Sequence, residues 1–594
     1  MRKYPSIPLA QTVVRLCKRM GIKRVVICAG SRNAPLTNGF VSNAYFKTYS
    51  VVDERAAAFF ALGMAQQLKC PVGIVCTSGS ALLNMYPAIA EAFYSDIPIV
   101  VISADRMPHR IDIGDGQTIR QNGVFDLHLE ASAKLKPDVI HATKTLLSNP
   151  MQKLLPKNVD DKTIQAVQQQ HQQHNEKEII RVLNIAFEKS GPVHLNIPLE
   201  EPLYGMTDQP LSLAKPILDT QKTPKSPKDF DTFYKHWHTA EKKWVIIGQM
   251  APGEMDQKLI DQLCLDPSVI VFTETTSNVN HPKAIGSIDV LMAPLEQLDF
   301  DPKRISPEVI LTFGGMVVSK KIKAFLRHHP PQHHAHVHFK KAYNTYYCLD
   351  FHFKLAPNAF LKLLYPKELI VKTNNFQTSV LSLYQKLKSK GADYINTLPY
   401  SDFYVFKVLS TLLPPNLHLQ VANSSSIRYT QLLEWSKGTQ FFCNRGTSGI
   451  DGSTATAVGA SLIQKLPTVL ITGDLSFFYD INGLWNDAIP KNFKVVLINN
   501  YGGGIFRILP GEKDTLNYDL YFETIHRRDA KHLAKAFGFQ YKCVRYGWNL
   551  ERKLSRFLST DKGPKLIEIQ TPRRINDQVL LNYFKEMADN SLIS

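Results

Sequence analysis

Short apolar segments alternate with helical patterns along most of this 594-residue chain. The apolar run at 24–28 follows a helical pattern at 9–20, and the run at 72–76 follows a helical pattern at 55–68. Strands that alternate with helices form parallel, doubly wound sheets, and ligands of such sheets bind beyond the carboxyl ends of the strands. The sequence therefore predicts an α/β fold whose strand ends carry the chemistry.

The pattern is divided into three blocks, as expected for a chain too long to form one hydrophobic core. We predict doubly wound parallel sheets in a first domain at 1–203, a linker and central Rossmann-like domain at 204–392, and a third domain at 393–594. Residues 204–243 are rich in proline and lysine, which is typical of a linker. Residues 136–178 are polar, and we predict that they form a surface helix or a loop insertion without chemistry.

Composition narrows the class of protein. A hydrophobic content of 44% with 21% charged residues is ordinary for a soluble globular protein. No apolar run reaches the roughly 18 residues that span a bilayer, and no secretory signal pattern is found. We therefore expect a cytoplasmic protein without a transmembrane segment. The eight cysteines form no Cys-x-x-Cys pair, which argues against a zinc site or a disulfide framework.

The net charge of +18 raises the alternative of a nucleic-acid-binding protein. The lysines and arginines are spread along the chain, however, and form no basic stripe interleaved with aromatic residues. An enzyme that attracts anionic substrates accounts for the same charge. We expect no nucleic-acid partner, and a non-catalytic protein that binds anions or nucleic acid stays as the alternative from a different class.

Two motifs in the third block end neighbouring apolar runs. Gly473-Asp474-Leu475-Ser476 follows the run at 468–472, and Asn499-Asn500-Tyr501-Gly502-Gly503 ends the run at 494–499. A separation of 26 positions between Asp474 and Asn500 is enough for one helix and the next strand. Carboxylate, amide and backbone carbonyl oxygens are ligands that Mg²⁺ takes together with phosphate oxygens. We therefore predict a metal site at Asp474, Asn500 and Gly502, with a diphosphate held by the glycines and the following helix.

This pair of motifs resembles the fingerprint of the thiamine-diphosphate enzymes, with Leu475 at the usual third glycine. The resemblance implies thiamine diphosphate with Mg²⁺, or Mn²⁺ in its place, between pyrimidine-binding and diphosphate-binding domains of different subunits. It also implies a glutamate at a strand end of the first domain, which Val51-Val52-Asp53-Glu54-Arg55 supplies. By this resemblance, Glu54 is the catalytic residue that bonds the N1′ nitrogen of the cofactor, so that the 4′-imino group can remove the C2 proton.

Four further stretches, at 30–36, 103–106, 423–428 and 444–452, resemble the 2-succinyl-5-enolpyruvyl-6-hydroxy-3-cyclohexene-1-carboxylate synthases of menaquinone biosynthesis. The most specific is Asn444-Arg445-Gly446-Thr447-Ser448-Gly449-Ile450-Asp451-Gly452. The resemblance covers most of the chain and implies decarboxylation of 2-oxoglutarate and 1,4-addition of the carbanion to isochorismate, in a homodimer or a dimer of dimers. Both substrates are dicarboxylates, which arginines bind through paired hydrogen bonds.

The resemblance also implies site residues by position. Those for the substrates are Arg32, Arg106, Gln117, Lys320, Ser424, Arg428 and Arg445. Those for the cofactor are Glu54, Ser448, Gly449, Ile450, Gly473, Asp474, Leu475, Ser476, Asn500, Gly502, Ile505 and Phe506, with Ile450 as the wedge that bends the cofactor. The chain departs from the family at Lys320-Lys321, commonly Lys-Arg, and at Asp115-Gly116-Gln117, more usually Ala-Asn-Gln.

Two other interpretations are open at this point. Another thiamine-diphosphate decarboxylase or ligase, such as an acetolactate synthase-like enzyme, shares the cofactor motifs, and many of those enzymes bind FAD in the middle domain. The histidine-rich segment 328–338 has the composition of a metal-binding tract. The alternation at His334, His336 and His338 instead predicts one face of a strand that leaves a proline turn.

Overall fold

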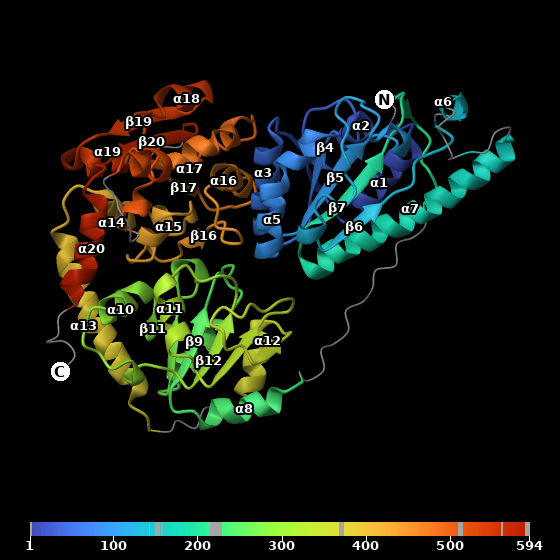
Figure 1. The fold of residues 1–594 in the computed structure, drawn as a ribbon. Helices are drawn as coiled ribbons and strands as arrows, with labels where there is room; N and C mark the ends of the chain where they lie inside the picture. Colours follow the sequence, from blue (N-terminus) through green and yellow to red (C-terminus); the bar gives the residue numbers. More distant parts are fainter. Residues whose placement is uncertain are drawn as a thin grey trace. The chain divides into compact units, whose positions relative to one another are not determined.

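The computed structural model describes residues 3–141, 143–148, 155, 159–213, 228–366, 373–508, 515–559 and 562–588. The described chain contains three six-stranded sheets in which every strand pair is parallel, and helices connect the strands (Figure 1). This architecture confirms the predicted α/β class with three doubly wound sheets. No helix in these residues is both long and apolar enough to cross a membrane.

The chain divides into two compact units. Unit 1 comprises Met1–Thr220, Gly446–Lys465 and Phe478–Phe493, and unit 2 comprises Gln221–Arg445, Leu466–Phe477 and Lys494–Ser594. The predicted boundary between residues 392 and 393 falls inside the helix α13 (Phe376–Asn396). Part of the predicted linker, residues 214–227, lies outside the described residues. The three predicted domain ranges stay predictions.

The sheet of unit 1 has the order β3-β2-β4-β5-β7-β6. The chain passes from β2 to β3 in one direction and then returns to the other side of β2 for β4, so β2 and β4 flank a topological switch point. Its four inner strands, β2, β4, β5 and β7, are buried on both faces, as expected for a parallel sheet, whereas the edge strands β3 and β6 are partly exposed. Their bounds are β2 Arg24–Ile27, β3 Lys47–Ser50, β4 Val72–Cys76, β5 Ile99–Asp105, β6 Ala131–Lys134 and β7 Val193–Pro198.

Part of the predicted insertion at 136–178 is helical and largely exposed, and a few of its polar side chains are buried. The 29-residue helix α7 (Asp161–Lys189) begins inside it and runs on along β6 and β7 (Figure 1). Gln168 is buried, donates to Asp138 Oδ1 at 2.6 Å and accepts a hydrogen bond from the backbone N–H of Val139 at 2.8 Å. The polar composition therefore reflects buried hydrogen bonding as well as surface, although residues 142, 149–154 and 156–158 lie outside the described part.

Unit 2 contains the other two sheets. The central sheet has the order β11-β10-β9-β12-β13-β14 and the third has the order β16-β15-β17-β18-β20-β19. One hydrophobic cluster joins them through helices α10 (Ile288–Leu295), α13 and α20 (Asn576–Met587), and it includes Trp244 of the central sheet and Leu419 of the third. The strands are β9 Lys243–Ile247, β10 Val269–Phe272, β11 Ala284–Ile285, β12 Val309–Phe313, β13 His333–Val337, β14 Phe351–Phe353, β15 His418–Val421, β16 Gln440–Phe442, β17 Thr468–Gly473, β18 Lys494–Asn499, β19 Gln540–Val544 and β20 Lys565–Gln570.

The histidine-rich segment forms β13, which confirms the predicted strand, with His338 just beyond its end. Ring nitrogens of His334 and His336 lie 3.0 and 2.8 Å from the hydroxyl oxygen of Thr312. Burial lowers the pKa of His334 to about 4 and that of His336 to about 3, so both rings are neutral near pH 7. Within the described residues, no three His, Cys, Asp or Glu side chains gather into a metal site.

Helices α3 (Glu54–Leu68) and α16 (Ser453–Ser461) of unit 1 touch backbone to backbone. A Cβ atom on Gly63 would lie 2.0 Å from the carbonyl oxygen of Thr456, and one on Gly459 would lie 2.0 Å from that of Phe60. Both carbonyl oxygens belong to the main chain of a helix, so they cannot rotate away as side-chain atoms could. Glycine at both positions is therefore what allows the two helices to approach this closely.

Replacement of Gly63 by alanine should force the two helices apart. We expect Gly63→Ala to lower the free energy of unfolding by about 1–3 kcal/mol, which is typical of overpacking, even though alanine is the better helix former. Urea unfolding followed by circular dichroism measures the change. Gly286→Ala is the matched control because its nearest neighbour would be 3.9 Å away. Equal stability of the two variants would contradict the close contact.

Candidate functional site

Asp474 begins helix α17 (Asp474–Tyr479) directly after β17 and is buried. Its Oδ1 accepts a hydrogen bond from the backbone N–H of Leu475 at 2.7 Å, and its Oδ2 accepts one from the backbone N–H of Gly502 at 2.9 Å. Strands β17 and β18 are neighbours, with Gly473 opposite Ile498. The structure thus brings together the two strand-end motifs that the sequence places side by side.

Asn500 supplies an oxygen that the described protein leaves without a partner. Its Nδ2 donates to Asp402 Oδ2 at 2.7 Å, whereas its Oδ1 is buried and accepts no hydrogen bond from any described residue. Buried polar atoms are rarely unsatisfied, so this oxygen indicates a missing donor or cation. The Nε2 atom of His526 lies 3.2 Å from Asp474 Oδ2. Burial raises the pKa of Asp402 to about 6.

The surroundings of these two residues fit a bound metal ion and diphosphate. A carboxylate, an unpaired amide oxygen and the backbone carbonyls of a glycine-rich turn are the hard ligands that Mg²⁺ takes. A Cβ atom on Gly473 would have no neighbour within 4 Å, so there is room for a ligand beside the backbone at the end of β17. Leu475 is half-buried and Ser476 is buried.

Glu523 holds the loop after β18 in place through its backbone and its side chain. The backbone N–H of Gly503 donates to the Glu523 carbonyl oxygen at 2.6 Å, and the buried Glu523 carboxylate pairs with Arg507 and with Arg573, the latter at 2.8 Å. The predicted cofactor residues Ile505 and Phe506 lie half-buried in the short helix of Gly504–Ile508. Glu523 was not predicted from the sequence, because nothing in its neighbourhood marks it as an anchor.

Glu54 is the first residue of α3 in unit 1 and is half-buried. Asp53 caps this helix: its Oδ1 accepts hydrogen bonds from the backbone N–H groups of Arg55 and Ala56, and its Oδ2 accepts one from Asn482 Nδ2 at 2.7 Å. Within the described part of the chain, no group donates a hydrogen bond to the Glu54 carboxylate. The local structure therefore fixes the backbone of Glu54 and leaves its carboxylate open to a ligand, while its predicted catalytic role stays a prediction.

The 446–452 segment is held by Glu91, a residue that the sequence analysis missed. Glu91 is buried in α5 (Tyr86–Ser95), and its two oxygens accept the backbone N–H groups of Gly446 and Thr447 at 2.8 and 2.7 Å. Gly452, with φ of +75°, packs where a Cβ would lie 2.3 Å from the Phe59 ring. The predicted cofactor residues Ser448, Gly449 and Ile450 lie between these two anchors. The sequence signal that could have identified Glu91 is its position as the single acid in the mostly apolar run 86–95.

Arg32 and Arg106 lie close together beyond the strand ends of unit 1, around Glu201. Arg32 is buried, donates to the Leu199 carbonyl oxygen at 3.0 Å and forms an ion pair with Glu201. Arg106 Nη1 lies 4.0 Å from Glu201 Oε1, and Arg106 Nη2 donates to the Gly116 carbonyl oxygen at 2.8 Å. Gln117 follows directly, with φ of +56°. These three predicted substrate residues are therefore brought to one place.

Glu200 and Glu201 complete this cluster and were not predicted. Burial raises the pKa of Glu200 to about 7. Burial acts in the same direction on Glu201, but hydrogen bonds from Glu200 and Arg32 outweigh it and lower the pKa of Glu201 to about 2. Arg110 Nη2 donates to Glu200 Oε1 at 2.9 Å. Carboxylates thus already pair with guanidinium groups here, which is the chemistry that a carboxylate substrate would use.

In unit 2 the structure gathers Ser424, Arg428 and Arg445. Arg428 Nη1 donates to the Ser424 carbonyl oxygen at 2.7 Å, and Arg445 Nη1 donates to Asn423 Oδ1 at 2.8 Å. Burial, and next the charge of Arg445, lower the pKa of Arg428. Two guanidinium groups near each other favour an anion between or beside them. This is consistent with a dicarboxylate substrate.

Lys320 begins helix α11 (Lys320–His328) and is exposed. The turn before it is held by Glu274, whose oxygens accept the backbone N–H groups of Val318 and Ser319 at 2.7 and 2.8 Å. Glu274 is buried, and burial raises its pKa to about 7. Lys321, at the position where the family commonly has arginine, pairs with Glu296 on the surface.

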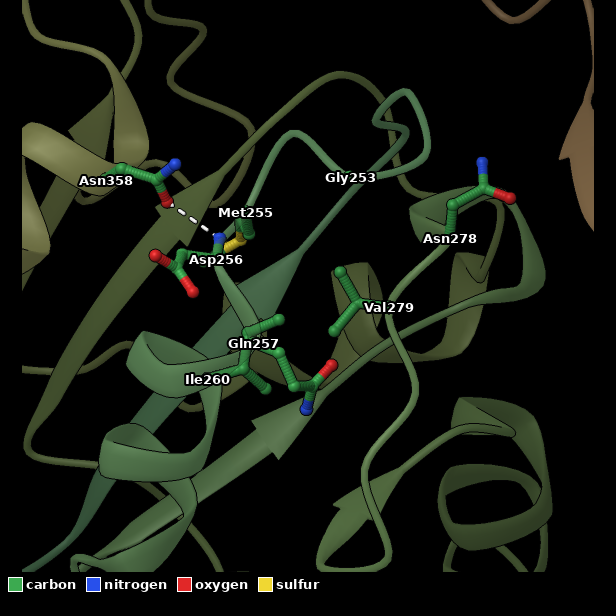
Figure 2. Close-up of a pocket in the computed structure, with 8 residues that line it drawn as sticks. All are labelled: Gly253, Met255, Asp256, Gln257, Ile260, Asn278, Val279 and Asn358. Atoms are coloured by element: carbon green, nitrogen blue, oxygen red, sulfur yellow. Dashed lines mark hydrogen bonds between the residues drawn. The ribbon is translucent and has the colours of Figure 1, made fainter. Parts of the chain in front are cut away.

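A cavity of about 500 Å³ in unit 2 contains none of the predicted site residues. It lies at the start of α9 (Gln257–Leu265), where Asp256 N–H donates to Asn358 Oδ1 at 2.9 Å (Figure 2). Asn278 Nδ2, on the opposite wall, donates to the carbonyl oxygens of Met250 and Phe441. These polar groups already have partners, so we assign the cavity no chemistry. Its lining residues are Gly253, Met255, Asp256, Gln257, Ile260, Asn278, Val279 and Asn358.

Comparison with known proteins gives two kinds of match. Residues 7–125 match the family described as thiamine pyrophosphate enzyme, N-terminal TPP binding domain, and residues 423–569 match the corresponding C-terminal TPP binding domain. The chain is also similar to proteins named 2-succinyl-5-enolpyruvyl-6-hydroxy-3-cyclohexene-1-carboxylate synthase. That of Christiangramia forsetii is 48% identical over 98% of this chain and 100% of its own length. Those of Flavobacterium psychrophilum and Porphyromonas gingivalis are 46% and 32% identical, over 98% and 97% of this chain and 100% and 96% of their own lengths.

Asp480 makes the stability of unit 1 depend on pH. Its Oδ2 accepts the backbone N–H of Ala455 at 2.8 Å at the start of α16, and burial raises its pKa from 3.8 to about 7. A raised pKa means that folding favours the protonated acid. Its contribution to stability is therefore complete below about pH 4 and is lost as the pH rises through about 7.

We expect Asp480→Asn, which mimics the protonated acid, to reduce this loss of stability between pH 4 and pH 7. Urea unfolding of the variant and the native protein at several pH values in this range measures the difference. Asp208→Asn, at an exposed position of unit 1, is the control and should leave the pH dependence as in the native protein. An unchanged pH dependence in Asp480→Asn would show that the acid is ionised throughout.

Proposed function

Because the chain belongs to the 2-succinyl-5-enolpyruvyl-6-hydroxy-3-cyclohexene-1-carboxylate synthases, a family of thiamine pyrophosphate enzymes, we propose that it acts on 2-oxoglutarate and isochorismate. The enzyme releases CO₂ from 2-oxoglutarate and joins the remaining carbanion to isochorismate by 1,4-addition, as a step of menaquinone biosynthesis. The observation that carries the proposal is the 48% identity to a protein of that name over 98% of this chain.

Thiamine diphosphate would be held by the residues at the ends of β17 and β18. Asp474, Asn500 Oδ1 and the Gly502 carbonyl oxygen would bind Mg²⁺, or Mn²⁺ in its place, and the open space beside Gly473 would take the diphosphate. When bound, thiamine diphosphate supplies a nucleophilic carbon and an electron sink for decarboxylation. Ser448, Gly449, Ile450, Ile505 and Phe506 would complete the contacts.

Glu54 would hold a proton at the N1′ nitrogen of the cofactor. Its carboxylate accepts no hydrogen bond from the described residues, whereas the neighbouring Asp53 is fully used as a helix cap. The helix start therefore presents one carboxylate to the ligand and uses the other to fix the backbone. This division of roles supports Glu54, rather than Asp53, as the catalytic acid.

The arginines would orient the two dicarboxylates. Arg32, Arg106 and Gln117 would form one anion-binding group in unit 1, and Ser424, Arg428 and Arg445 would form another in unit 2. Lys320, exposed at the start of α11, would supply a further positive charge. Planar guanidinium groups bind carboxylates through two parallel hydrogen bonds and fix their orientation. We further propose that the protein is located in the cytoplasm and that it is a homodimer or a dimer of dimers. Light scattering of the purified protein measures its molar mass and so tests the number of subunits.

The proposed reaction is tested with 2-oxoglutarate, isochorismate, thiamine diphosphate and Mg²⁺, with product mass as the readout. We expect the product only when both substrates are present. In the same assay, pyruvate in place of 2-oxoglutarate should give no product. Activity on pyruvate, together with bound FAD, would instead favour an acetolactate synthase-like enzyme. Binding of oligonucleotides without cofactor binding would favour the non-catalytic alternative.

Glu54→Gln should abolish the chemistry without unfolding the protein. A neutral amide cannot hold the proton at N1′, so we expect CO₂ release to fall by about 10²–10⁴-fold, the range for general acid–base groups. Circular dichroism checks the fold, and Glu188→Gln, at an exposed site on α7, is the control. Native rates of CO₂ release in Glu54→Gln would remove the assigned role.

A further inference from the structure

We propose that Asp402 is a positioning residue for the metal ion, because it fixes which end of the Asn500 amide faces the metal. The inference rests on the proposed function, since it assumes that Asn500 is a metal ligand. Asp402 is the first residue of α14 (Asp402–Leu412) and is buried, and nothing in its sequence context distinguishes it from an ordinary helix start.

An asparagine amide has an oxygen end that binds cations and an NH₂ end that repels them. Asn500 Nδ2 donates to Asp402 Oδ2 at 2.7 Å. An ionised carboxylate accepts hydrogen bonds and donates none, so Asp402 selects the NH₂ end of the amide. The oxygen end is thereby turned to the other side, where Oδ1 is buried and accepts no hydrogen bond from the described residues.

Asp402 is itself fixed by groups from the C-terminal part of the chain. Its Oδ1 accepts the hydroxyl of Thr571 at 2.5 Å, and its backbone N–H donates to Asn576 Oδ1 at 2.8 Å. Asn576 Nδ2 in turn donates to the Pro572 carbonyl oxygen at 3.0 Å. Neither Asp402 oxygen can turn away without breaking one of these contacts, so the amide orientation of Asn500 is set before any ligand binds.

The same carboxylate adds negative charge close to Asp474. Asp402 Oδ2 accepts a hydrogen bond from Asn500, and Asp474 Oδ2 accepts one from Gly502, two residues further along the same loop, so both acids contact this loop. Two ionised carboxylates that are buried in one region repel each other. A divalent cation bound beside them offsets this repulsion. Asp402 therefore supports the metal both by orienting a ligand and by its charge.

The test is the affinity of the full-length protein for Mn²⁺ in the presence of thiamine diphosphate, measured from the electron paramagnetic resonance of free Mn²⁺. We expect Asp402→Asn to raise the Kd by about 10–100-fold, the range for partners of metal ligands. The new amide can donate to Asn500 Oδ1 and invert the ligand. An unchanged Kd in a folded Asp402→Asn protein would overturn the inference.

A charge-swapped variant separates orientation from folding. Asp402→Asn with Asn500→Asp restores one donor and one carboxylate at the same hydrogen bond, and places an oxygen toward the metal. We expect its Kd to return to within several-fold of the native value. Should the single variant not fold, the swap still decides: native-like Mn²⁺ binding supports the inference, and weak binding by a folded swap overturns it. Asp529→Asn, at an exposed site of unit 2, is the control.

Asp474→Ala distinguishes failure of this inference from failure of the proposed function. Loss of Mn²⁺ binding in Asp474→Ala with a native Kd in Asp402→Asn would overturn only the role of Asp402. A native Kd in Asp474→Ala would overturn the metal site on which the proposed function depends, and the inference with it.

Discussion

The contact between helices α3 and α16 is the constraint on which unit 1 depends. Residues 63 and 459 are far apart in the sequence, yet the absence of a side chain at each lets two helix backbones touch. Glu54 stands at the beginning of α3, and the 446–452 segment leads into α16. One close helix pair therefore fixes the backbone on which two groups of predicted cofactor residues are carried.

Buried carboxylates that accept backbone N–H groups fix the other loops. Glu91 holds the segment at 446–447, Glu274 holds the turn before α11, and Asp480 caps α16. Each carboxylate accepts hydrogen bonds from backbone N–H groups that would otherwise lack a partner in a sheet or helix. Such anchors allow long strand-end loops to present side chains in one orientation, which catalysis and ligand binding both require.

Much of the fold and part of the candidate site could be predicted because their signals are local. An apolar run that ends in Gly473-Asp474 predicts both a strand and the residue that follows it. Strand β13 was predicted from the alternation of its histidines. Glu91 and Glu201 were missed, because their partners lie 355 and 169 positions away in the sequence. The burial of Gln168 within the predicted insertion was missed because glutamine counts as polar in a sequence.

The return of the chain to unit 1 at 446–465 and 478–493 has a consequence for biosynthesis. During translation the first 220 residues leave the ribosome long before the helix that covers α3 has been made. Until then Phe59 and Phe60, which are buried in the complete protein, lack part of their cover. The N-terminal region therefore finishes folding late, and fragments that stop before residue 446 should be prone to aggregate.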